Sequence, residues 1–209
     1  MKEYGMDEIK EVFLKICRVC EDKKDSLTEI DSKLGDGDMG ISMSSGAQAI
    51  RKTIQTFPEQ EKNLTKLFLS SAMAFNRAAP STLGTLLSFG MMAIGKELKN
   101  REYIEEAEIP ALVRRFADTI SEKGKAKVGD KTILDALYPY ADALEEVYTN
   151  TASMDKALQA AEEAARAGME STKGKKAKTG RASWLDTRNM EYPDAGTVLC
   201  VFVAEELRR

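Results

Sequence analysis

The feature that most constrains the fold of this chain is the spacing of its apolar residues, which follows the period of an α-helix along nearly the whole sequence. Between Met6 and Cys20, apolar positions recur every three or four residues, as on the buried face of an amphipathic helix. The same spacing predicts helices near residues 6–20, 40–57, 64–75, 80–94, 109–120, 130–147 and 154–169. The sequence therefore predicts an all-α protein.

Several residues are expected to mark boundaries or bends in these helices. Pro80 is well placed to open the fourth, since its fixed φ suits the first helical turn. Asp130 is expected to cap the sixth, and Pro139 to kink it. The last apolar run, 197–204, favours strand by composition but has no partner strand, so it predicts an eighth, buried helix. We expect one domain, residues 1–209, of about eight antiparallel helices.

Composition excludes several classes of protein. The 209 residues carry a net charge of −3, so a nucleic-acid partner bound mainly through charge is not expected. No apolar run is long enough to span a bilayer, so no membrane partner is expected, and residues 1–8 lack the features of a secretory signal. Cys17, Cys20 and Cys200 lack the paired spacing of a zinc site. We expect them to be buried apolar side chains in a cytoplasmic protein.

The sequence contains no histidine. This excludes histidine general bases, histidine zinc ligands, Ser-His-Asp triads and a phosphohistidine on this chain. Any acid–base or phosphoryl chemistry must therefore use carboxylates, lysine, arginine, a metal or a partner protein.

The most distinctive polar segment is residues 31–40, Asp-Ser-Lys-Leu-Gly-Asp-Gly-Asp-Met-Gly. Asp31, Asp36 and Asp38 repel one another unless a cation lies among them, and the glycines allow tight turns that bring them together. Oxygen ligands without His or Cys favour Mg²⁺ or Ca²⁺, and protein-bound Mg²⁺ usually keeps positions open for phosphate oxygens. The alternative is a solvated turn, since Asp and Gly are common in turns. An EF-hand loop fits poorly, because Ile41 falls where that loop needs its glycine.

Two further segments are unusual. Residues 123–132 combine glycines, lysines and a threonine before a predicted helix, an arrangement that can bind an anion. Residues 171–196 contain several lysines and arginines and the single tryptophan, Trp184. A basic run is ordinarily a solvated loop, and the functional alternative is a flap that faces phosphate.

Together and in this order, four motifs resemble the nucleotide-binding (L) subunit of bacterial dihydroxyacetone kinases, the domain that also forms the C-terminal half of ATP-dependent single-chain kinases. The matching residues are Asp31 with Gly35-Asp36-Gly37-Asp38 and Gly40, then Gly124-Lys125-Ala126 with Gly129-Asp130-Lys131-Thr132 and Asp135, then Gly180-Arg181-Ala182-Ser183-Trp184, and finally Asp194 with Gly196. The likeness covers essentially the whole chain, and four motifs in register are far more specific than any one alone.

The resemblance implies an eight-helix antiparallel up-and-down barrel with a nucleotide at one rim. It implies that Asp31, Asp36 and Asp38 carry two Mg²⁺ ions, which bridge the phosphates of bound ADP or ATP. The other positions assigned to the nucleotide are Gly40, Ser42, Ser81, Thr82, Gly129, Thr132, Arg181, Asp194 and Gly196. No catalytic nucleophile is assigned to this chain.

The sequence departs from the family before the fourth helix. Typical members have Gly-Gly-Ala-Ser-Gly-Pro there, whereas this chain has Asn-Arg-Ala-Ala-Pro-Ser at residues 76–81. Pro80 donates no N–H, although Ser81 and Thr82 could still offer hydroxyls and amides. The usual histidine after the second motif aspartate is Met39, and a position near it that is often asparagine is Ser42. These changes indicate a divergent branch and leave its sugar or polyol substrate open.

The resemblance implies a kinase subunit that passes a phosphoryl group from nucleotide to a small ketose or polyol held on a separate K-type subunit. In phosphotransferase-dependent members, a phosphohistidine on a third protein recharges the bound ADP, and direct use of ATP is the alternative. A rival interpretation is a non-catalytic regulatory or scaffold module, favoured by the altered segment 76–82. Whether the chain forms a homodimer is left open.

Overall fold

The computed structural model describes residues 2–179, 183 and 190–209. Helices account for most of this part of the chain, which confirms the all-α class. The helices are α1 Met6–Asp22, α2 Lys24–Leu34, α3 Met39–Gln55, α4 Leu64–Ala78, α5 Thr82–Glu97, α6 Ile109–Gly124, α7 Leu134–Thr151, α8 Met154–Glu170 and α9 Ala195–Arg208. Two short strands, β1 Glu3–Tyr4 and β2 Ile104–Glu105, pair antiparallel, and a 3₁₀ turn, η1 Glu106–Glu108, follows β2.

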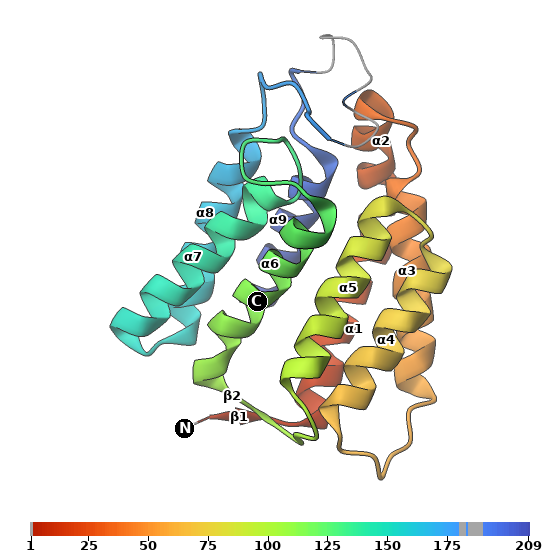
Figure 1. Ribbon diagram of the computed structural model, residues 1–209, viewed down its shortest axis with the longest axis vertical. Coiled ribbons are helices and arrows are strands. Elements are labelled where there is room, and N and C mark those ends of the chain that lie inside the picture. Colours follow the sequence, from red (N-terminus) through yellow and green to blue (C-terminus); the bar gives the residue numbers. More distant parts are fainter. Residues whose placement is uncertain (1, 180–182, 184–189) are drawn as a thin grey trace.

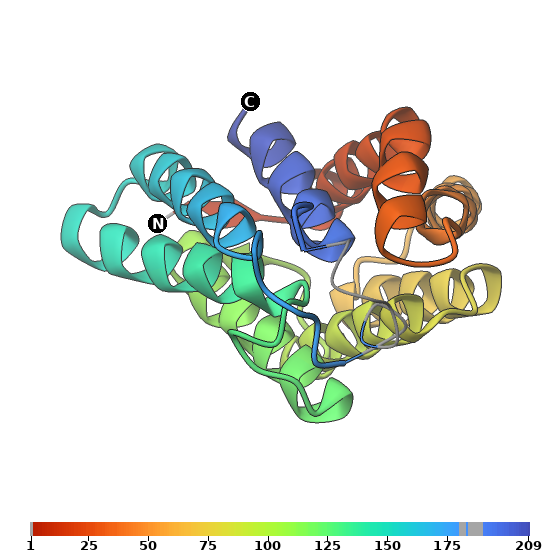
Figure 2. The ribbon, with the colours of Figure 1, turned by 90° about the horizontal axis from the view of Figure 1, so that it is seen from above.

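Eight of these helices form a closed ring, which Figure 2 shows from above. In order around the ring, α1 contacts α3, each helix from α3 to α9 contacts the next, and α9 contacts α1 again. The remaining helix, α2, is not part of this ring and packs on α3 and α9. Apolar spacing did not predict α2, because only Leu27, Ile30 and Leu34 are apolar among its eleven residues.

The predicted helix boundaries were wrong at two positions. Pro80 does not open α5, because Ser81 is the N-cap and the helix begins at Thr82. Asp130 does not cap α7, which begins four residues later, because the carboxylate bonds the amide of Lys127 within the preceding loop. Pro139 lies inside α7 as expected.

The core lies inside the ring and consists of two clusters. One is built mainly on α1, α3 and α4, and the other on α6, α7 and α8. Helix α9 contributes to both, with Leu199 in the first cluster and Val201 in the second. This explains why the apolar run at 197–204 is nearly continuous and confirms that it is a buried helix. The three cysteines are buried and unpaired.

The up-and-down path sends alternate connections to opposite ends of the ring. The α2–α3, α4–α5 and α6–α7 connections and the described ends of the α8–α9 connection lie at one end (Figure 1). The β1–β2 pair and the α3–α4 connection lie at the other end. Within the part of the chain that the structure describes, no helix is long and apolar enough to cross a bilayer.

Candidate functional site

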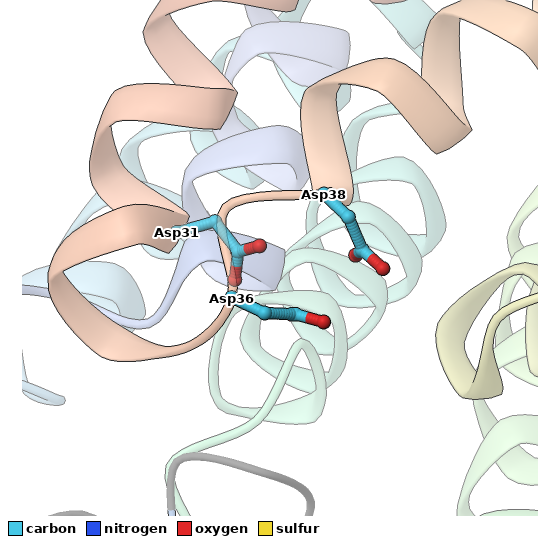
Figure 3. Close-up of side chains that lie close together, drawn as sticks. All are labelled: Asp31, Asp36 and Asp38. Carbon is cyan, nitrogen blue, oxygen red and sulfur yellow. The ribbon is translucent and has the colours of Figure 1, made fainter.

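Three aspartates converge at the corner between α2 and α3, and their side chains extend into the same space (Figure 3). Asp31 lies in the last turn of α2, and Asp38 immediately precedes α3. One carboxylate oxygen from each of Asp31, Asp36 and Asp38 lies within 4.8 Å of the others. The structure therefore brings together the acids that the sequence analysis grouped.

The corner depends on a turn that only glycine tolerates. Gly37 has a φ of 72°, and a Cβ there would lie 2.4 Å from the hydroxyl of Ser32. Beyond the turn, the amide of Met39 donates to a carboxylate oxygen of Asp31 at 3.1 Å. This bond satisfies an amide at the first turn of α3 and fastens the end of α2 to the start of α3.

A second glycine allows α2 and α3 to pack closely beside the corner. A Cβ on Gly40 would lie 2.0 Å from the carbonyl oxygen of Lys24 and 2.4 Å from the hydroxyl of Thr28. Gly40 is therefore required for the close crossing of α2 and α3. Ser42, one turn into α3, is half-buried, and its amide donates to the carbonyl of Asp38 at 2.9 Å.

The charge at the corner suits a small divalent cation. The start of α3 supplies about half a positive charge, too little to balance three carboxylates. The ligand set is all oxygen, which is the preference of Mg²⁺ and Ca²⁺. Asp36 is exposed, so the cluster opens to solvent and to a ligand. The residues present therefore fit Mg²⁺.

Ser81 and Thr82 lie at the start of α5, where Ser81 is the N-cap. The hydroxyl of Ser81 is engaged as the N-cap and accepts a hydrogen bond from the amide of Gly84 at 3.0 Å. Thr82, the first residue of α5, is exposed. Amides of a first helical turn have no partner within the helix, so Thr82 offers a further contact for an anion.

The α6–α7 loop is shaped by one buried carboxylate. Asp135, 1% exposed, accepts a hydrogen bond from the amide of Gly129 at 2.7 Å and another from the amide of Thr132 at 2.9 Å. Gly129 has a φ of 91°, and a Cβ there would meet nothing within 4 Å, so backbone conformation rather than space requires glycine. Asp135 thus fixes both loop residues that the sequence analysis assigned to the nucleotide.

Asp194 caps the start of α9 and lies beside the same loop. Its carboxylate accepts from the amide of Thr197 at 3.0 Å. Part of the residue surface stays accessible, but the carboxyl group itself is deeply packed. This burial, with the nearby charge of Asp135, raises the pKa of Asp194 to about 7. Gly196 is packed closely as well, since a Cβ there would lie 3.0 Å from that of Ile133.

Asp130 and Lys131 join the α6–α7 loop to the α8–α9 connection. The carbonyl of Asp130 accepts from the amide of Lys178, and its carboxylate pairs with the Lys178 ammonium at 3.1 Å. The Lys127 amide and the Lys178 charge lower the pKa of Asp130. The ammonium of Lys131 donates to the carbonyl of Tyr192 at 2.8 Å. No local pattern in the sequence predicts these bridging contacts.

A basic cavity of about 670 Å³ opens between these two segments. Its lining comprises Gly129, Lys175, Lys176, Ala177, Lys178 and Ser183. Its three lysines are exposed and give the cavity a positive charge that suits an anion. Arg181 and Trp184 lie outside the described residues.

The connections that carry the described motif residues therefore lie at the same end of the ring, although they are far apart in sequence (Figure 1). Among the contacts that were not predicted, the two hydrogen bonds accepted by Asp135 have the clearest signal in the sequence. Thr132 and Asp135 have the Thr-x-x-Asp spacing that often marks the start of a helix, with a carboxylate returning to an upstream amide.

Fold and site together define an all-α ring protein with three clustered carboxylates at one rim. Residues 33–209 match the model of the DAK2 domain, and the chain belongs to that family. The matched range includes Asp36 and Asp38 and begins two residues after Asp31.

Curated relatives fall into two groups by length. The chain is 29% identical over 177 residues to the "PEP-dependent dihydroxyacetone kinase 2, ADP-binding subunit DhaL" of Listeria innocua, covering 85% of this chain and 82% of that protein. It is 30% identical over 179 residues to an L-erythrulose kinase of Pectobacterium atrosepticum, covering 86% of this chain but only 30% of the relative.

A solved structure shares the fold. The dihydroxyacetone kinase from C. freundii in complex with AMP-PNP and Mg²⁺ superposes with a TM-score of 0.74 at 23% identity, covering all of this chain and 34% of the kinase. The chain thus spans about a third of these longer kinases.

Proposed function

We propose that this chain is the nucleotide- and Mg²⁺-binding subunit of a kinase for a dihydroxyacetone-type small ketose or polyol. It would form one domain over residues 1–209, act in the cytoplasm and bind ADP or ATP. The observation that carries the proposal is the cluster of three carboxylates within 4.8 Å, at the end of the ring that carries the other described motif residues.

In this proposal, Asp31, Asp36 and Asp38 hold two Mg²⁺ ions. The ions would supply charge neutralisation for the nucleotide phosphates during phosphoryl transfer. The turn at Gly37 and the Asp31–Met39 bond hold the carboxylates in place before the cation arrives. Such preorganisation lowers the cost of assembling like charges.

The remaining rim residues would position the nucleotide. Gly129 and Thr132 shape the loop beside it, Thr82 offers an amide and a hydroxyl, and Asp194 and Gly196 set the start of α9. Gly40 and Ser42 support the acidic corner, and Ser81 caps α5. Arg181 is proposed from its motif alone.

The name of the Listeria relative supports a division of labour between subunits. We propose that the substrate lies on a separate K-type subunit and that a phosphohistidine donor recharges bound ADP. Direct use of ATP is the alternative, since both donors employ the same nucleotide.

Calorimetric titration of ADP in the presence and absence of Mg²⁺ tests the proposal. We expect Mg²⁺-dependent binding in the wild type and loss of most of it in Asp36→Asn. Asp25→Asn is the matched control, because Asp25 is an exposed acid on the same helix outside the cluster. Wild-type protein that binds no adenine nucleotide at micromolar concentrations would contradict the proposal.

The altered segment 76–82 favours one alternative function, that of a non-catalytic regulatory or scaffold module. In this segment Pro80 has no amide to donate. Asp36→Ala separates the two functions. A scaffold would retain its partner proteins in this variant, whereas a kinase subunit would lose phosphoryl transfer.

A further inference from the structure

Lys131 is held in an arrangement that lysine rarely adopts. Its φ is 59°, in the left-handed region that favours glycine, and only 4% of the residue is exposed. Burial lowers the pKa of Lys131, which reflects the unfavourable desolvation of its ammonium group. Both features are destabilising, so they persist only where surrounding contacts hold the residue in place.

The contact that holds the side chain crosses between two connections at the rim. The ammonium donates at 2.8 Å to the carbonyl of Tyr192, which is 61 residues away in sequence. The charge of Asp194, two residues further along, opposes the lowering of the Lys131 pKa. A charged donor on a carbonyl makes a strong hydrogen bond, particularly away from water.

The stretch that Lys131 holds also contacts the acidic corner. The ring of Tyr192 lies under the ammonium of Lys33, 4.9 Å from ring centroid to nitrogen. Lys33 is on α2, two residues beyond Asp31. Tyr192 therefore contacts both α2, the helix that carries Asp31, and the loop that carries Gly129 and Thr132.

The other end of the α8–α9 connection is anchored on the neighbouring residue. Lys178 bonds Asp130 through its backbone amide at 3.0 Å and its side chain at 3.1 Å. A further hydrogen bond joins the two ends of this connection, from the amide of Asp194 to the hydroxyl of Thr172 at 3.0 Å. Two adjacent residues, Asp130 and Lys131, thus make hydrogen bonds to both described ends of the α8–α9 connection.

We propose that Lys131 is a positioning residue that holds the Tyr192–Asp194 stretch, so that the acidic corner and the α6–α7 loop keep one relative arrangement for the nucleotide. This inference rests on the proposed function for its binding readout. Lys131 acts through Tyr192 and need not touch the nucleotide.

Substitution with methionine tests the role, because Lys131→Met keeps the length of the side chain and removes the donor. We expect ADP binding in the presence of Mg²⁺ to weaken roughly 10- to 100-fold, the range found when residues that orient ligand-binding groups are removed. Lys131→Arg retains a charged donor and should recover most of the affinity. Hydrogen exchange should accelerate in Lys131→Met at amides 192–197 and 129–135.

Lys99→Met is the matched control. Lys99 is exposed and follows α5 at the opposite end of the ring, outside every motif. It removes the same charge without touching Tyr192, so we expect a change of no more than about twofold, as for an exposed charge screened by solvent. If Lys131→Met fails to fold, Lys131→Gln, which keeps a shorter neutral donor, takes its place and should bind weakly.

The outcomes separate this inference from the proposed function. Wild-type protein that fails to bind nucleotide contradicts the proposed function, and the exchange measurement still tests the positioning role. Wild-type binding that survives unchanged in Lys131→Met, or exchange rates equal to those of Lys99→Met, would overturn the inference. Failure of Lys131→Arg to recover binding would do the same.

Discussion

The close crossing of α2 and α3 makes Gly40→Ala an informative perturbation. A methyl group on Gly40 would lie 2.0 Å from the carbonyl oxygen of Lys24, where ordinary contact begins at 3.4 Å. The helices would have to separate by about 1.4 Å, because the obstacle is backbone and cannot rotate away. The acidic corner spans this same pair of helices, so the separation would pull Asp31 away from Met39.

The expected magnitude combines two opposing effects. Overpacking a close contact typically destabilises by about 1–3 kcal/mol, and rigid backbone places this case at the upper end. Replacing glycine with alanine inside a helix returns up to ~1 kcal/mol. We therefore expect the free energy of unfolding to fall by about 2 kcal/mol in urea denaturation. Affinity for Mg²⁺ with ADP should fall as well, in calorimetry at a temperature where the variant is folded.

Gly46→Ala provides the comparison within the same helix. Its methyl group would meet the ring of Phe75 at 2.4 Å, on the contact between α3 and α4. Stability should fall there too, while Mg²⁺-dependent binding by the folded fraction should remain. Gly40→Ala protein with wild-type stability and wild-type affinity would refute the argument that this crossing sets the acidic corner.

Two further predictions concern the buried acids. Asp135→Ala leaves the amides of Gly129 and Thr132 without a partner, and since each unpaired buried group costs about 1–3 kcal/mol we expect a loss of about 3 kcal/mol in urea denaturation. Asp135→Asn keeps one acceptor oxygen and should lose less, and equal stability of the two variants would contradict the two-bond account. Because the folded pKa of Asp194 is raised to about 7, the folded state retains a proton that the unfolded state releases, and its contribution to stability is full below about pH 4 and is lost as pH rises through 7. Asp194→Asn keeps the cap on α9, so its unfolding free energy should lack this decline, which approaches ~1.4 kcal/mol per pH unit; parallel profiles for both proteins would show that Asp194 is not the titrating group.

Helix prediction succeeded where one face of the helix is apolar. The range 154–169 followed directly from apolar spacing, because α8 has one buried stripe facing its neighbours. Helix α2 was missed because its burial is small, and its position depends on the crossing with α3 rather than on its own sequence. The closed order of the ring came from the family resemblance, since apolar spacing does not say which helices become neighbours.

Site residues were likewise predicted where the signal is local in the sequence, and long-range contacts were not. The three aspartates were found because like charges close in sequence demand an explanation. Their convergence depends on Gly37, which the sequence marked as a turn. The contact between Lys131 and Tyr192 joins residues with no local pattern, so no spacing rule could have paired them.

The interruption at Lys23 connects the fold to the site. Helices α1 and α2 follow one another with this single residue between them, whereas every later helix in the ring is joined to the next by a reversal of direction. The second helix therefore continues beyond α1 and places Asp31 at the end where the other motif-bearing connections lie (Figure 1). The eight helices of the ring would supply those connections, but none of them carries Asp31. The short polar helix that apolar spacing could not predict is thus the element that brings the acidic cluster to the rim.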